Sequence, residues 1–123
     1  MGLIEKMIKT YKVDFWTREK IASVQKKRLA SLVNYARENS PFYRDLYKDI
    51  PDDYTLTDLP TVSKPQLMEH FDQVLTDRNI SMNRIDDFTQ NIDNIGRMID
   101  EKYLIFKTSG STGNPAVVLY DKG

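Results

Sequence analysis

Hydrophobic residues recur at helical spacing along most of the chain, beginning at its N-terminus. The first apolar positions are Leu3, Ile4, Met7, Ile8 and Tyr11. Lysines and Glu5 fill much of the opposite face, so this segment is predicted to be a short amphipathic helix. Its lysine-rich face suits a membrane surface. Because so short a helix would bind lipid weakly, docking on the domain or on a partner is the favoured interpretation.

A second helix is predicted to begin after Thr17. Thr17 is a suitable N-cap, and Glu19 places a negative charge in the first turn, where the helix dipole favours it. Asn39 suits a left-handed C-terminal position, and Pro41 prevents continuation. The expected buried stripe consists of Ile21, Val24, Leu29, Leu32, Val33 and Ala36.

Hydroxyl residues mark the starts of three further helices. Ser40 precedes Pro41, and this pair predicts a cap followed by a first helical residue. The aromatic residues that follow are Phe42, Tyr43 and Tyr47. They suit ligand stacking or anchoring in a core, and the second interpretation is favoured.

Ser63 and Gln66 have the spacing of a capping box. The helix that they begin is expected to bury Leu67, Met68, Phe71, Val74 and Leu75. Its one histidine, His70, is interpreted as a surface or hydrogen-bonded residue. Ser81 is predicted to cap a last helix that Gly96 interrupts. The apolar positions of that helix are Ile85, Phe88, Ile92 and Ile95.

The pattern changes to extended structure after residue 102. Tyr103 to Phe106 and Ala116 to Tyr120 are rich in β-branched and aromatic residues, which predicts two strands. The expected fold is therefore α+β, with four or five short helices over residues 1–101 and a β-hairpin over residues 102–123. The 123 residues have room for one domain with a modest core.

Composition narrows the classes of function. The chain has no cysteine and a single histidine, which excludes disulfides, thiolate catalysis and sites with several histidine ligands. No apolar run approaches the roughly 20 residues of a membrane-spanning helix, so a cytoplasmic protein without a transmembrane segment is expected. The acidic residues Asp86, Asp87, Asp93 and Asp100 favour a solvated face over a metal site, and no catalytic residue is predicted.

The formal net charge is zero, but it divides into +5 over residues 1–50 and −5 over residues 51–123. A basic module that approaches nucleic acid or an anionic membrane is one interpretation. The favoured one is that the two faces attract each other or that a partner covers them. No basic-and-aromatic RNA motif is present, so no nucleic-acid partner is expected.

The candidate chemistry lies between the two predicted strands, in the loop Thr108-Ser109-Gly110-Ser111-Thr112-Gly113-Asn114-Pro115. Glycines at 110 and 113 allow positive φ, and successive amides can then form a concave nest for phosphate oxygens. The loop differs from a Walker-type loop, because two residues separate its glycines and no lysine follows. A plain hairpin turn remains the alternative interpretation.

The order of residues in the loop resembles the phosphate-binding signature of the adenylate-forming ligases. Two upstream stretches narrow the resemblance to one branch of that family: Leu32 to Arg44, around Asn-Ser-Pro-Phe-Tyr, and Leu59 to Lys64. Together they resemble the start of the phenylacetate–CoA ligase and capsular-polysaccharide CapK branch, from about Ala30 to Tyr120.

The resemblance implies that the loop holds the β- and γ-phosphates of ATP, with Mg, while a small carboxylic acid attacks the α-phosphorus; coenzyme A then takes the acyl group. The implied nucleotide-binding residues are Thr108, Ser109, Gly110, Ser111, Thr112 and Gly113. One departure is Asn114, where this branch often has lysine before the proline, and Ala116 follows where other branches carry lysine. Two other lysines, Lys107 and Lys122, lie near the loop in the sequence.

The family's remaining catalytic parts are implied to lie downstream of the loop, so this chain alone is expected to be inactive. It is interpreted as the N-terminal part of such a ligase. The alternative is a non-catalytic helical interaction module that retains a vestigial loop. Because a two-stranded ribbon leaves unpaired edges, self-association through the hairpin is also expected.

Overall fold

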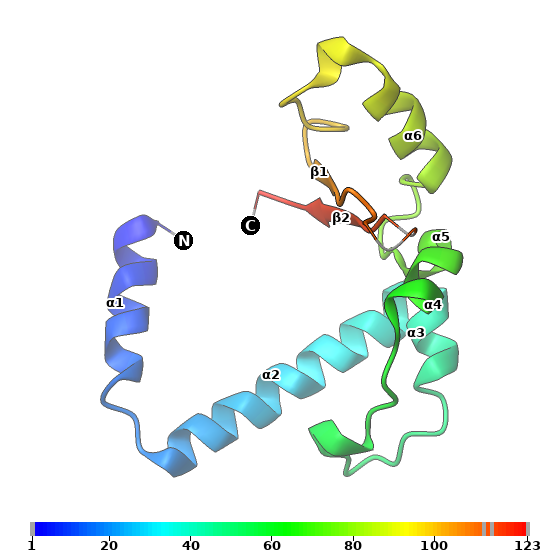
Figure 1. Ribbon diagram of the computed structural model, residues 1–123. Coiled ribbons are helices and arrows are strands. Elements are labelled where there is room, and N and C mark those ends of the chain that lie inside the picture. The colour runs from blue at the N-terminus through cyan, green and yellow to red at the C-terminus, as the bar shows by residue number, and fades with distance from the viewer. Residues whose placement is uncertain (1, 112, 114, 123) are drawn as a thin grey trace.

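The computed structural model describes residues 2–111, 113 and 115–122. It confirms an α+β fold that is mostly helical, with a two-stranded antiparallel hairpin near the C-terminus (Figure 1). The α-helices are α1 (Leu3–Val13), α2 (Arg18–Asn39), α3 (Pro41–Leu46), α4 (Lys64–Glu69), α5 (Phe71–Val74) and α6 (Met82–Gln90). The 3-10 helices are η1 (Leu56–Asp58) and η2 (Ile92–Asn94), and the strands are β1 (Leu104–Lys107) and β2 (Val117–Tyr120).

The helix starts follow the hydroxyl caps, as predicted. The Thr17 hydroxyl oxygen accepts a hydrogen bond from the Lys20 amide at 3.2 Å. Ser63 and Gln66 form the reciprocal capping box at the start of α4. Ser81 accepts from the Arg84 amide at 3.3 Å and caps α6. Each cap satisfies an amide that the first helical turn leaves without a partner.

Ser40 forms the corner between α2 and α3. Its side chain is fully buried, accepts from the Tyr43 amide at 3.3 Å and donates to the Gln73 carbonyl at 3.0 Å. The predicted left-handed conformation at Asn39 is wrong, because Asn39 is the last helical residue and Ser40 itself is extended. Extended backbone before a proline is the sterically favoured state, so Ser40 ends one helix and caps the next.

Two predicted apolar faces are interrupted or turned toward solvent. On α2, Val33 is buried where α3 folds back, but its neighbour Leu32 points about 100° away and is 65% exposed. The predicted helix from Ser63 breaks at His70, an exposed residue, and gives α4 and α5.

The last predicted helix also ends early, at Gln90. The Asn91 side chain accepts from the Asp93 amide at 3.0 Å, a local bond that competes with helix continuation. Ile92 and Ile95 are consequently more than three-quarters exposed instead of buried.

The core lies where α5 and α6 meet the hairpin. Its buried members are Phe71, Ile80, Ile85, Ile99 and Val117. Ile105 and Leu119 pack against this cluster from the inner face of the hairpin. The helical part therefore holds one face of the hairpin and leaves its opposite face open.

The strands pair in the register Leu104 with Tyr120 and Lys107 with Val117. Tyr103 lies just before β1 and forms an isolated bridge with Ile99. On the outer face Phe106 and Tyr120 are about half exposed and meet edge to face at 5.3 Å. In the described part of the chain the sheet has two strands, so each strand keeps one unpaired edge. No helix among the described residues is both long and apolar enough to cross a membrane.

Candidate functional site

The candidate loop is joined to the hairpin by Thr108 and Ala116. The Thr108 amide donates to the Ala116 carbonyl at 2.9 Å, and the Ala116 amide donates to the Thr108 hydroxyl oxygen at 2.8 Å. This pair extends the strand ladder beyond Lys107 and Val117. Thr108, predicted as a phosphate donor, therefore already has a structural role in closing the loop.

Within the loop, a tight turn links Gly110 to Gly113. The Gly113 amide donates to the Gly110 carbonyl at 2.7 Å, and both glycines have positive φ, +66° and +91°. A Cβ on Gly110 would lie 2.9 Å from the Pro115 nitrogen and 3.0 Å from its Cδ. Glycine at position 110 is thus required both by the backbone conformation and by the approach of Pro115.

Ser109 and Ser111, unlike Thr108 and Gly113, take no part in the hydrogen bonds that close the loop. Both are exposed, and no hydrogen bond between described residues uses their amides or hydroxyls, or the amide of Gly110. Among the described residues, these are the donors that remain for a ligand at the tip of the hairpin. Thr112, predicted to be a phosphate donor, and Asn114, the departure from the family pattern, lie outside the described residues.

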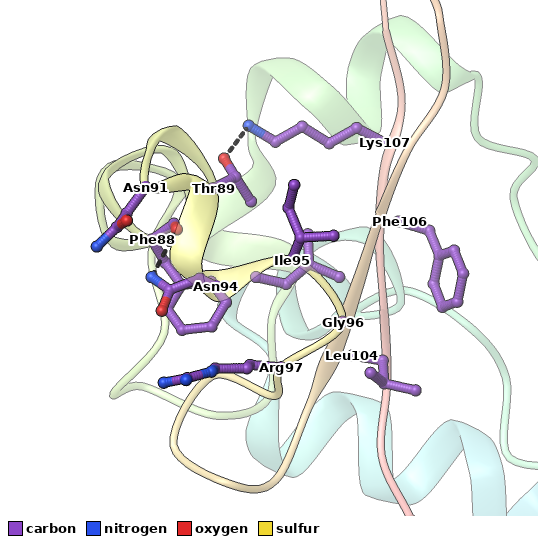
Figure 2. A pocket seen from close by; sticks show the side chains of 11 residues that line it. Phe88, Thr89, Asn91, Asn94, Ile95, Gly96, Arg97, Leu104, Phe106 and Lys107 are labelled. Carbon is purple, nitrogen blue, oxygen red and sulfur yellow. Dashed lines mark hydrogen bonds between the residues drawn. The ribbon is translucent and has the colours of Figure 1, made fainter.

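The two nearby lysines do not lie at the loop. Lys107 bends back onto α6, where its Nζ lies 2.6 Å from Asp86 Oδ1 and 2.9 Å from the Thr89 hydroxyl (Figure 2). Lys122 follows the far end of β2, beyond the Leu104–Tyr120 pair, whereas the loop joins the opposite end of the hairpin. Neither lysine replaces the cation that the loop sequence lacks.

A groove of about 410 Å³, which sequence reasoning missed, runs beside β1. Phe88 of α6, Ile95 and Gly96 after η2, and β1 contribute to its walls. In Figure 2 the side chains of Leu104 and Phe106 point to the side of β1 away from Ile95. Gly96 has φ +74° and turns the chain back toward the hairpin. Gly96, which interrupts the apolar pattern, was the sequence signal for this turn, and the exposed side chain of Ile95 just before it lines the groove.

Asp77 anchors the segment that leads into β1. Its carboxylate accepts from the Asn79 amide at 3.0 Å, from Lys102 Nζ at 2.9 Å and from the Tyr103 hydroxyl at 2.8 Å. The Asn79 amide, followed by Lys102 and Tyr103, holds the pKa of Asp77 well below its usual range. Tyr103 and Asp77 in turn raise the pKa of Lys102. This network fixes the base of the hairpin.

The acidic residues after Ser81 are held in ion pairs or separated. Asp86 pairs with Lys107, and Asp100 forms a two-point contact with Arg84. Among the described residues, no group of three histidine or carboxylate side chains is arranged to hold a metal ion.

Comparison with known proteins gives no further identification: no family model, no curated protein and no solved structure matches the chain.

Proposed function

We propose that this chain is the N-terminal part of an ATP-dependent, AMP-forming ligase that activates a carboxylic acid, in the phenylacetate–CoA ligase and CapK-like branch. In this proposal the loop from Thr108 to Gly113 holds the β- and γ-phosphates of ATP, with Mg as counterion. The complete enzyme would form an acyl-adenylate from a small carboxylic acid and pass the acyl group to coenzyme A. The cytoplasm, which supplies ATP and coenzyme A, is the proposed location.

The observation that carries the proposal is the set of donors at the hairpin tip. Ser109 and Ser111 are exposed and use no donor in hydrogen bonds between described residues, while Thr108 and Ala116 hold the loop closed beneath them. Small hydroxyl side chains and neighbouring amides are the groups that bind phosphate oxygens in loops of this kind. The sequence signature supplies the class of reaction, and the open donors support the phosphate contact.

The alternative is a helical interaction module with a vestigial loop, and two observations favour it. The turn already uses the Gly113 amide, and Lys107 is engaged by Asp86. A loop that needed Gly110 for the Pro115 contact and Gly113 for the turn alone would show the same conformation. Under this alternative the chain does not bind nucleotide.

Titration calorimetry with ATP and Mg separates the two functions. The proposal predicts measurable binding by the wild-type chain and about a hundredfold or more weaker binding by Ser109→Ala/Ser111→Ala, since the variant removes two hydrogen bonds to charged oxygens, each of which contributes roughly 1.5–3 kcal/mol. The control is Ser31→Ala, an exposed serine on α2 whose hydroxyl donates to Lys27. Absence of heat with the wild-type chain, or equal binding by the double variant, contradicts the proposal.

We also propose that copies associate through the hairpin, whose strands each keep an unpaired edge. Light scattering over a concentration series tests this, with Val118→Lys as the variant that places a charge on the open face. The expected result is a concentration-dependent dimer that the variant abolishes, and a monomer at all concentrations contradicts it.

A further inference from the structure

Helix α1 has no buried residue, although five of its eleven residues form an apolar face. Leu3 and Ile4 are about three-quarters exposed, and Met7 and Tyr11 about two-thirds. In Figure 1, α1 stands apart from the hairpin and from the helices that pack around it. Hydrophobic side chains gathered on one exposed face indicate a surface that something else covers.

Most apolar side chains of α1 gather on one side of the helix, and its lysines lie on the other. At 100° per residue, Leu3, Met7, Tyr11, Ile4 and Ile8 fill an arc of about 140°. Lys6, Lys9 and Lys12 lie on the remaining arc together with Thr10, Val13 and Glu5, the one acidic residue of the helix. No ion pair between described residues uses these three lysines. Their charge is therefore available to an anionic surface.

Aromatic residues continue the apolar face beyond the end of the helix. Phe15 is 73% exposed and meets the Tyr11 ring edge to face at 5.4 Å. Trp16 follows, with Lys20 Nζ 5.9 Å from its ring centroid. Aromatic rings beside lysines are typical of side chains that lie at the boundary between lipid and water.

We propose that α1 lies in the surface of an anionic lipid bilayer, with Leu3, Met7 and Tyr11 toward the acyl chains and the lysines at the headgroups. Charge complementarity favours lipid over an acidic face of a second copy. Three of the carboxylates that would attract lysines, Asp77, Asp86 and Asp100, already pair with cations of their own chain. The planar boundary between lipid and water also suits a helix with apolar side chains on one side, because the flanking lysines can extend their charged ends to the headgroups.

The expected binding is reversible and depends on salt. A helix of eleven residues is about 16 Å long and buries few side chains, so the lysines supply a large part of the attraction. Each lysine near an anionic surface strengthens binding about fivefold at low ionic strength. This inference concerns α1 and does not depend on the loop.

Sedimentation of the full chain with lipid vesicles tests the proposal. The vesicles are phosphatidylcholine alone or phosphatidylcholine with phosphatidylserine, each at low and high salt. Two variants are compared, Lys6→Gln/Lys9→Gln/Lys12→Gln on the polar face and Leu3→Asp/Met7→Asp on the apolar face. The control removes the same charge elsewhere, with Lys27→Gln/Arg28→Gln/Lys64→Gln. Because α1 buries nothing, the melting temperatures should match, which is checked by circular dichroism.

We expect the wild-type chain to sediment with the phosphatidylserine vesicles at low salt. Binding should be at least tenfold weaker in both α1 variants. The charge control should bind within about twofold of wild type once the effect of its lower net charge has been measured by salt titration. Absence of binding to anionic vesicles overturns the proposal. So does binding that the charge control weakens as much as the lysine variant. A dimer that the Leu3→Asp/Met7→Asp variant dissociates, without vesicle binding by the wild type, assigns the face to a second copy and overturns it as well.

Discussion

Gly110 and Pro115 approach each other so closely that no side chain fits between them. A Cβ on Gly110 would lie 2.9 Å from the Pro115 nitrogen, and the φ of Gly110 is +66°. This contact closes the loop next to the Thr108–Ala116 hydrogen bonds, and Ser109 and Ser111 lie exposed at the tip of the hairpin. The glycine thus shapes the loop, whatever the loop binds.

Gly110→Ala should therefore destabilise the chain more than an alanine at another left-handed glycine. Gly96 has φ +74° and nothing within 4 Å of a Cβ, so Gly96→Ala carries the backbone strain alone, about 1 kcal/mol. We expect Gly110→Ala to lose roughly 1–3 kcal/mol more, because Pro115 must move. Urea unfolding of the two variants measures the difference in the free energy of unfolding. Equal losses of stability in the two variants would show that the crowding by Pro115 adds nothing to the cost.

Asp77 should make stability depend on pH in the acid range. Its pKa in the folded state lies below the value near 3.9 of an unfolded chain, so its contribution is present above about pH 4. That contribution is lost as the pH falls below 4 toward the lower folded value. Asp77→Asn should cost roughly 1.5–3 kcal/mol at pH 7, the range for hydrogen bonds to a charged group.

The difference between wild type and Asp77→Asn should shrink as the pH falls from 4 to 2, measured by denaturant unfolding at each pH. Asp52→Asn, which changes an exposed carboxylate, is the matched control and should leave stability unchanged across the range. A constant difference between pH 7 and pH 2 would contradict the role of the Asp77 charge.

Ser40→Ala removes two hydrogen bonds from a fully buried side chain, one from the Tyr43 amide and one to the Gln73 carbonyl. We expect a loss of about 2 kcal/mol, since a cap and a partly buried carbonyl both lose their partner. Ser81→Ala removes a helix cap alone and should cost about 1 kcal/mol. Thermal melts compare the two, and a Ser40→Ala loss no larger than that of Ser81→Ala would argue against the tie to α5.

The helix starts could be predicted from the sequence because capping is local. A hydroxyl at one position and an amide three residues later, as at Ser63 and Gln66, need no knowledge of the rest of the chain. The hairpin was predicted to within one residue at each strand for the same reason, since β-branched runs on either side of a glycine loop are a short-range signal.

Burial and long-range pairing could not be read from periodicity. Leu32 fits a helical stripe but faces solvent, because the partner helix α3 returns on the side of Val33. The hydrogen bond from Tyr103 to Asp77 joins residues 26 apart, and that from Lys107 to Asp86 joins residues 21 apart. Neither spacing leaves a pattern in the sequence. The loop residues were predicted from the motif, whereas the structure distinguishes Thr108, which closes the loop, from Ser109, which is exposed.

The most direct test of the phosphate-binding loop compares pyrophosphate with AMP by amide chemical shifts. Pyrophosphate carries the phosphates that the loop is proposed to hold, and AMP lacks them. We predict that pyrophosphate with Mg shifts the amides of Ser109, Gly110 and Ser111, with Gly96 and Gly2 unmoved, and that AMP leaves all five in place. Shifts with AMP but none with pyrophosphate, or no shift at the loop with either, would contradict the account.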